Sequence, residues 1–160
     1  MRRLLLILVA TVVAASLVAA TSVTAAGAAT PVHFSATFPN PFTDTESCGF
    51  PIDVSLQVDL HGTLFLDDQG NIEKAIIEQN IVGTDTANGV TLRDATHYVD
   101  IMDSLGGVKE VGLDFHVQNG GLILRNAGYL AMNPDGSVAF VHGPHPFPAG
   151  DISAFCAAFS

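Results

Sequence analysis

The sequence predicts an all-β fold: an antiparallel up-and-down barrel of about eight strands, followed by a short C-terminal helix. Apolar and polar residues alternate with a period of two in several segments, most regularly in 52–60. Turn signals separate these segments, and most connections are too short to hold the crossover helices that parallel strands require. Closing the sheet into a barrel removes its exposed edges. A two-sheet β-sandwich is the alternative fold.

The predicted strands follow one another along the chain, at 32–38, 52–60, 63–66, 72–82, 90–102, 111–117, 122–130 and 138–141. We expect Pro39 and Pro41 to end the first strand, because proline has no N–H for the ladder. Gly62 is expected to mark a bulge or bend between the second and third strands. The Asn88-Gly89 pair predicts a hairpin turn.

Two elements need further argument. The segment 72–82 has consecutive apolar residues that also allow a short helix, but its β-branched residues and flanking turns favour a strand. At the C-terminus we expect a short helix over 152–159 with Asp151 as its N-cap. Phe155 and Phe159 would then lie on one face of that helix.

The N-terminal segment 1–28 has the composition of a secretory signal peptide. Arg2 and Arg3 precede an apolar run of about 17 residues, and small residues with Ala-x-Ala spacing follow it. An uncleaved membrane anchor is the alternative, because a run of this length approaches the minimum for crossing a bilayer. We therefore expect a signal peptide at 1–28, a single domain at 29–160, and a secreted, extracellular protein.

The balance of charges limits the classes of partner. The sequence has 16 Asp and Glu residues against 6 Lys and Arg residues, a net charge of −10. Without Arg2 and Arg3 the net charge becomes −12. Such a surface repels phosphate groups, so we expect neither nucleic acid nor, after signal cleavage, a membrane surface as a partner. The sequence does not indicate the oligomeric state.

Cys48 and Cys156 are the two cysteines of the chain, and we expect them to form a disulfide. Exported proteins meet oxidising conditions in which such pairs form and persist. The alternative is two free thiols or a catalytic cysteine. The disulfide would hold the end of the chain against the start of the strand at 52–60.

Polar groups forced into the interior are expected where the alternation breaks down, in 90–102 and 122–130. A bulge near Asp94 would reconcile the two apolar parities of the first of these segments. The two segments contain Asp94, His97, Tyr98, Arg125, Asn126 and Tyr129. From these residues, the predicted ligand-binding set is Asp94, His97, Arg125 and Tyr129.

These four side chains suit a small-ligand site in an otherwise apolar cavity. An arginine with Asp, His and Tyr can orient a carboxylate ligand or serve acid–base chemistry. The alternative is that Arg125 and Asp94 face solvent and the Tyr hydroxyls reach the rim, because burying an unpaired charge costs several kcal/mol.

Motifs of the common catalytic and metal-binding classes are missing from the sequence. There is no nucleophile elbow, phosphate-binding loop or His-Glu-x-x-His element. His142 and His145 supply two imidazoles, fewer ligands than zinc requires, and the Gly-Pro between them explains the motif as a turn. The acidic turn at 67–71 departs from the calcium-loop pattern. We therefore expect no metal and no cofactor.

Several motifs together resemble small secreted proteins of actinobacteria. They are the signal peptide, the Cys-Gly-Phe-Pro-Ile element at 48–52, the run at 124–128, the Asn-Pro-Asp-Gly turn at 133–136 and the tail at 143–158. Some proteins of that group look similar to the barrel of allene oxide cyclases and dirigent proteins. The resemblance implies a compartment and a fold, and it supplies no catalytic residues.

The function expected from these observations is a non-catalytic binding module for a small apolar ligand or an extracellular partner. One alternative is a cyclase- or isomerase-like enzyme that acts within the barrel cavity. Another is an inert structural protein of the cell envelope, whose interior would be filled by side chains.

Overall fold

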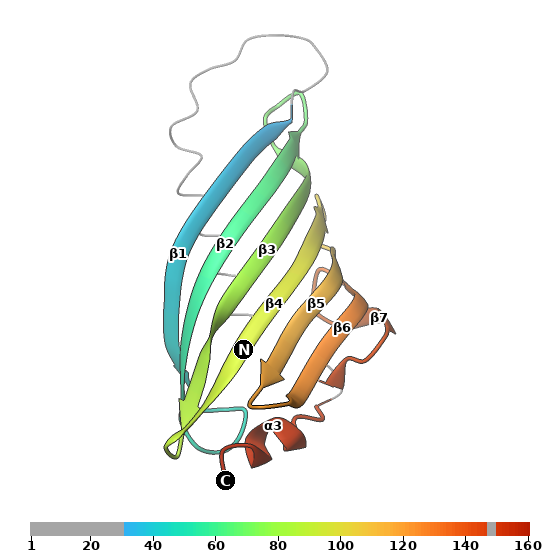
Figure 1. Ribbon diagram of the computed structural model, residues 1–160. Helices are drawn as coiled ribbons and strands as arrows, with labels where there is room; N and C mark the ends of the chain where they lie inside the picture. The colour runs from blue at the N-terminus through green and yellow to red at the C-terminus, as the bar shows by residue number, and fades with distance from the viewer. Residues whose placement is uncertain (1–30, 147–149) are drawn as a thin grey trace.

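The computed structural model describes residues 31–146 and 150–160, so the expected signal peptide lies outside the described residues. Seven antiparallel strands form one sheet in chain order, and a short helix follows them (Figure 1). The elements are β1 Val32–Asp44, β2 Ile52–Leu66, β3 Ile72–Ala87, β4 Val90–Asp103, β5 Val108–Gln118, β6 Leu122–Met132, β7 Val138–His142 and α3 Ser153–Ala157. The predicted all-β antiparallel fold is thus confirmed. Within the described residues β1 does not pair with β7, so backbone hydrogen bonds do not close the sheet into a barrel.

The sheet has seven strands because two of the eight predicted segments belong to one strand. Residues 52–66 pair with β1 without a shift at Gly62, which lies opposite Phe34. The predicted bulge or bend at Gly62 is therefore wrong. Gly62 instead allows a close approach, because a Cβ at this position would overlap the ring of Phe34.

Strand β1 is longer than predicted and continues through both prolines to Asp44. Among the described strands it pairs with β2 alone and therefore lies at an edge of the sheet. Pro39 and Pro41 are two residues apart, so their backbone nitrogens face the same side of β1. Both nitrogens can face away from β2, where no N–H is needed for the ladder. The two prolines therefore do not end the strand, and Asp44 lies at its end instead of in a loop.

The segment at 72–82 is a strand, as predicted, and β3 continues from it to Ala87. Asn88 and Gly89 have φ angles of 51° and 81° and form the turn into β4. Two positive φ values are characteristic of the tight turn that Asn-Gly favours. The predicted hairpin is confirmed.

The register between β4 and β5 shifts near Asp94, but the extra residue lies on β5, so the bulge expected within 90–102 is wrong. Between Asp94 and His97 two residues of β4 oppose three residues of β5. Asp114 also has no partner in the register with β6. The bulge reverses the parity of β5, so Glu110 before it and Val117 after it are both buried. Strand β5 is therefore not the regularly alternating strand that the sequence predicted.

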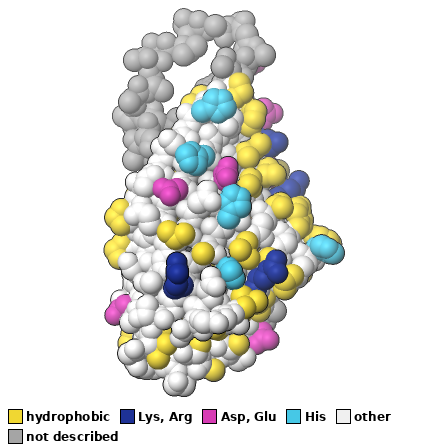
Figure 2. Space-filling view, in the orientation of Figure 1, with side chains coloured by type: hydrophobic (Ala, Val, Ile, Leu, Met, Phe, Trp, Pro, Cys, Tyr) yellow, Lys and Arg dark blue, Asp and Glu magenta, His cyan; other side chains and the backbone are white. Residues whose placement is uncertain are grey.

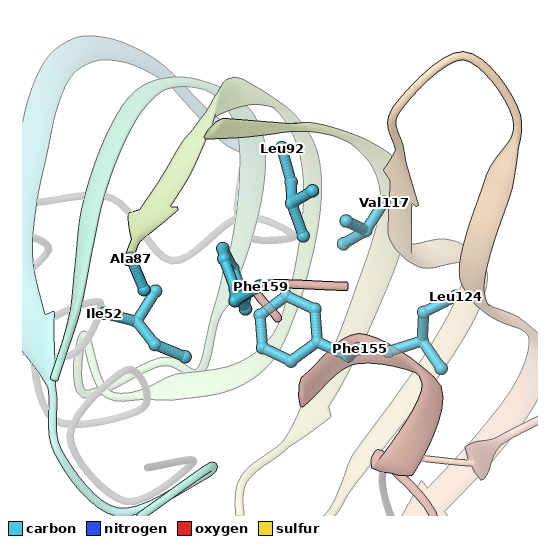
Figure 3. Packing of buried hydrophobic residues seen from close by; sticks show 7 residues of the cluster. All are labelled: Ile52, Ala87, Leu92, Val117, Leu124, Phe155 and Phe159. Carbon is cyan, nitrogen blue, oxygen red and sulfur yellow. The ribbon is translucent and has the colours of Figure 1, made fainter. Parts of the chain in front are cut away.

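One end of the inner face is filled by a cluster of hydrophobic side chains from the sheet and the C-terminal segment (Figure 3). Its buried members are Ile52, Ala87, Leu92, Val117, Leu124, Phe155 and Phe159. The Phe155 and Phe159 rings meet edge to face, with centroids 5.2 Å apart. The two rings are in contact although Phe159 lies beyond the end of α3, and they cover this end of the sheet.

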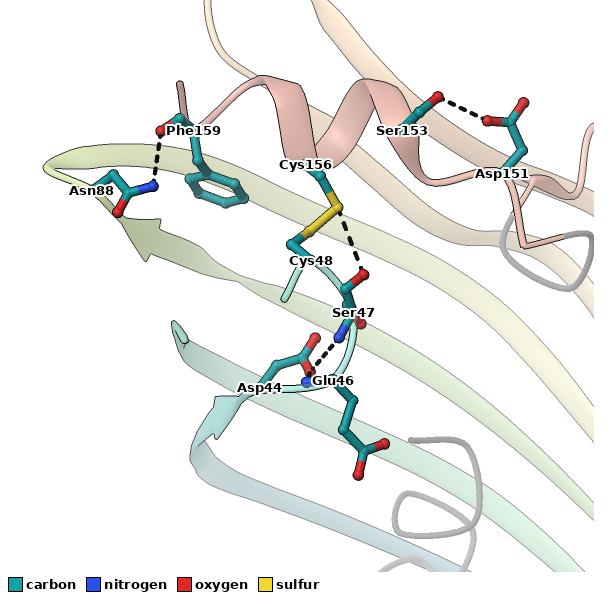
Figure 4. The surroundings of a disulfide bond; sticks show 9 residues. All are labelled: Asp44, Glu46, Ser47, Cys48, Asn88, Asp151, Ser153, Cys156 and Phe159. Atoms are coloured by element: carbon teal, nitrogen blue, oxygen red, sulfur yellow. Dashed lines mark hydrogen bonds between the residues drawn. A yellow bond between two sulfur atoms is a disulfide. The ribbon is translucent and has the colours of Figure 1, made fainter. Parts of the chain in front are cut away.

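The predicted disulfide between Cys48 and Cys156 is present, with Cα atoms 5.4 Å apart (Figure 4). It joins the loop before β2 to α3, which has five residues and is shorter than expected. Ile152 is the N-cap residue and no side chain caps the helix. Asp151, the predicted cap, instead accepts a hydrogen bond of 2.9 Å from the Ser153 hydroxyl.

The outer surface is chemically mixed. On the face seen in Figure 2, histidine and charged side chains lie among hydrophobic ones. Within residues 31–146 and 150–160, no helix has both the length and the apolar character needed to cross a membrane.

Phe159 is a buried member of the hydrophobic cluster. Phe159 is 1% exposed, whereas Phe140 on β7 is 55% exposed. We expect Phe159→Ala to lower the free energy of unfolding by about 3–5 kcal/mol, because it leaves a cavity in a packed cluster. Phe140→Ala is the matched control and should cost less than about 1 kcal/mol. Urea unfolding followed by circular dichroism measures both, and equal losses would contradict the role given to Phe159.

Candidate functional site

A cavity of about 130 Å³ lies between the inner face of the sheet and α3. Its apolar lining consists of Phe42, Ile52, Val54, Leu56, Ile81, Phe115 and Phe155. An engineered apolar cavity of about 150 Å³ holds a benzene molecule. This cavity is therefore suited to an apolar group of about one six-membered ring.

Polar side chains from four strands reach the same cavity. They are Asp44 on β1, Asp85 on β3, Asp94, Thr96 and Tyr98 on β4, and Asp114 on β5. No lysine or arginine of the described chain is among the lining residues. The polar part of the lining is consequently acidic, in contrast to the mixed Arg, Asp, His and Tyr site that the sequence predicted.

Three of these side chains are deeply buried and have an oxygen without a hydrogen-bond partner within the described residues. Asp85 is 2% exposed, Asp94 is 5% exposed and Thr96 is 7% exposed. The atoms concerned are Asp85 Oδ2, Asp94 Oδ1 and Thr96 Oγ1. Buried polar groups almost always have a partner, so three such atoms at one cavity make it the candidate site.

Burial changes the acidity of two of these carboxyl groups. Burial, together with repulsion from the charge of Asp44, raises the pKa of Asp85 to about 6. Burial likewise raises the pKa of Asp94 to about 7, with added repulsion from Asp85 and Asp114 and a partial offset from backbone N–H groups. Near neutral pH, Asp94 can therefore hold or release a proton.

The β5 bulge determines where Asp114 lies. Because of the extra residue, Asp114 and Phe115 both line the cavity although they are adjacent in the sequence. Asn126, which is fully buried on β6, donates a hydrogen bond of 2.6 Å from Nδ2 to Asp114 Oδ2. This bond holds the carboxylate at the edge of the cavity.

Asp44 has a structural role as well. Its Oδ1 accepts hydrogen bonds from the backbone N–H groups of Glu46 (2.9 Å) and Ser47 (3.2 Å), as Figure 4 shows. The side chain therefore shapes the turn that leads to Cys48. It connects the acidic side of the cavity to the disulfide.

Of the four predicted ligand-binding residues, the structure brings Asp94 to the cavity and leaves the other three outside its lining. His97 points outward, where its Nδ1 lies 2.6 Å from Asn80 Oδ1. Arg125 is exposed, and Tyr129 packs against Phe140 with ring centroids 5.8 Å apart. The physical reason is parity: even-numbered positions of β4 and β6 face inward, and these three residues are odd-numbered.

Sequence reasoning missed three acidic residues of the site. Asp85 has the same parity as Ile77 and Ile81, so extending the alternation past residue 82 would have found it. Asp44 follows Pro39 and Pro41, and a strand that ended at these prolines would leave it in a loop. A regular alternation over 111–117 would put Asp114 on the polar face, and only the pairing of β5 with its neighbours reveals the bulge.

Metal binding finds no support in the described geometry. Within residues 31–146 and 150–160, no group of three or more His, Cys, Asp or Glu side chains is arranged to hold a metal ion. His142 is exposed and His145 is buried, so the two imidazoles of the turn have different surroundings.

The raised pKa values predict how stability depends on pH. The folded state binds the protons of Asp85 and Asp94 more tightly than the unfolded chain, where the pKa is near 3.8. Their contribution to the free energy of unfolding is fully present below pH 3.8 and is lost as the pH rises through about 6 for Asp85 and about 7 for Asp94. As the pH rises from about 5 to about 8, we expect the free energy of unfolding to fall less for Asp94→Asn than for the wild type.

Urea titrations across this pH range measure the effect. Asp68→Asn, in the exposed turn between β2 and β3, is the matched control and should follow the wild-type profile. Parallel profiles for the wild type and Asp94→Asn would show that Asp94 is not a buried acid.

Comparison of the chain with protein-family models, with curated proteins and with solved structures found no match. The function proposed below therefore rests on the residues of this chain and on the geometry in which the fold places them.

Proposed function

We propose that the protein is a non-catalytic binding module that holds a small, largely apolar ligand in the cavity on the inner face of the sheet. The observation that carries the proposal is a largely apolar cavity into which Asp85, Asp94 and Thr96 direct buried atoms that have no hydrogen-bond partner in the described part of the chain. Ligand sites commonly combine mostly apolar walls with a few polar groups that orient the ligand. An inert structural protein would have an interior filled by side chains, whereas this interior contains a cavity of about 130 Å³.

We also propose that the protein is secreted and that its sheet encloses the ligand in the manner of a barrel. Side chains of β1 and β5 line one cavity, which supports a sheet that wraps around its ligand as in up-and-down barrels. The disulfide is consistent with an oxidising, extracellular setting. A relationship to secreted actinobacterial proteins with barrels like those of allene oxide cyclases and dirigent proteins is proposed on sequence motifs alone.

Filling the cavity tests this function. Val54 lines the cavity on β2, whereas Val82 on β3 is 56% exposed. We expect toluene to cause saturable amide shifts in the NMR spectrum of the wild type, confined to residues around the cavity. Val54→Phe should abolish these shifts because the larger ring occupies the space, and Val82→Phe should retain them. Shifts that persist in Val54→Phe would place toluene elsewhere and contradict the proposal.

A cyclase- or isomerase-like enzyme is the second candidate function, and one observation favours it. The pKa of Asp94 is raised to about 7 within an apolar cavity. A carboxyl group with such a pKa can donate and accept protons at neutral pH, as general acid–base catalysis requires. Strands β3 and β4 hold Asp85 and Asp94 on the same inner face, where their environments give them different pKa values.

Proton exchange with a small ketone tests the second candidate. If Asp94 is a catalytic base, the protein should accelerate exchange of the α-hydrogens of cyclohexanone for deuterium in D₂O, followed by proton NMR. Asp94→Asn should reduce that acceleration by about 10²-fold or more, and Asp68→Asn should preserve it. Exchange at the buffer rate with the wild-type protein would leave ligand binding as the function.

A further inference from the structure

We propose that the ligand is an organic ammonium ion, whose apolar part fills the cavity and whose N–H groups donate to Asp85, Asp94 and Thr96. This inference rests on the proposed binding function and specifies the chemistry of the ligand. It replaces the carboxylate ligand that the sequence suggested, because Arg125 is exposed and does not line the cavity.

Hydrogen bonding is the first argument. Among residues 31–146 and 150–160, no hydrogen-bond partner is found for three atoms at the cavity, Asp85 Oδ2, Asp94 Oδ1 and Thr96 Oγ1. All three are oxygens that can accept a hydrogen bond. A primary ammonium group carries three donors and no acceptor, so it can satisfy all three atoms. A carboxylate ligand offers only acceptors and would leave them unsatisfied.

Charge is the second argument. Asp44, Asp85, Asp94 and Asp114 line the cavity, and no cationic side chain of the described chain lines it with them. Lys74 lies over the ring of Phe65, 5.7 Å from its centroid. The other cations among the described residues, Arg93, Lys109 and Arg125, are exposed. Buried carboxylates without a counter-charge are costly, and a bound cation would relieve that cost.

The walls of the cavity favour an organic cation over a metal ion. Phe42, Phe115 and Phe155 are part of the lining, and aromatic rings attract organic cations. Calcium, by contrast, requires about six to eight oxygen ligands. No group of acidic or histidine side chains in the part of the chain that the structure describes is arranged for a metal ion.

The volume of the cavity sets the size of the probe. About 130 Å³ accommodates one ring with a short arm. Benzylammonium has this size, benzyl alcohol is its neutral counterpart, and benzoate is an anion with a similar ring. The three probes therefore differ mainly in the charge of the polar group.

The experiment measures the affinity of each probe by NMR titration at about pH 8, where the carboxyl groups of Asp85 and Asp94 are ionised. We expect benzylammonium to bind at least about tenfold more tightly than benzyl alcohol, because charge-assisted hydrogen bonds are roughly twice as strong as neutral ones. Benzoate should bind more weakly than benzyl alcohol.

Variants then identify the groups that recognise the charge. Asp85→Asn and Asp94→Asn should each weaken benzylammonium about tenfold and change benzyl alcohol by less than about threefold. Asp68→Asn should change neither affinity. Where an Asp variant does not fold, Thr96→Val provides the second test, since it removes an acceptor without changing the charge and should weaken the binding of benzylammonium.

The outcomes separate this inference from the function on which it rests. Equal affinities for benzylammonium and benzyl alcohol would overturn the ammonium ligand and leave an apolar binding module. Failure of every probe, toluene included, would overturn both proposals. Displacement of benzylammonium by millimolar calcium chloride, with calcium itself binding at the cavity, would identify an inorganic cation site and also overturn the inference.

Discussion

The disulfide between Cys48 and Cys156 is the constraint on which the end of the molecule that contains the cavity depends. Helix α3 has only five residues, too few to be stable in isolation. The covalent link and the aromatic contacts of Phe155 and Phe159 hold it against the sheet. Phe155 belongs both to the hydrophobic cluster and to the lining of the cavity. Without this attachment, the cavity would lose its cover on the helix side.

The acidic cluster opposes the stability that the hydrophobic cluster supplies. Asp85 and Asp94 are buried among apolar side chains, and their raised pKa values reflect the unfavourable transfer of charge from water. Natural proteins tolerate such conflicts mainly where function requires them. The β5 bulge adds to the cluster, because it directs Asp114 toward the cavity beside Phe115. Negative charges in an apolar cavity lower the stability of the fold, and they would favour the ammonium ligand that we propose.

The sequence predicted much of the strand framework because alternation is a local property. The inward parity of β2 and the Asn88-Gly89 turn were correct on this basis. Within the site the same reasoning reached Asp94, which lies in a segment where polar residues interrupt an apolar face. The same reasoning fails for His97. The break in the pattern suggests that inward and outward positions change places within the segment, but even-numbered positions face inward along the whole of β4.

By itself, the sequence determined the all-β class, most of the turns and the disulfide pairing, since each depends on residue type and close spacing or on a unique pair of cysteines. Only the tertiary structure decided the rest. The path of β1 through Pro39 and Pro41 depends on its place at the edge of the sheet. The exposure of Asp114 to the cavity depends on how two neighbouring strands pair with β5. The cavity exists because side chains from β1, β2, β3, β4, β5 and α3 surround one space, and no local pattern encodes that convergence.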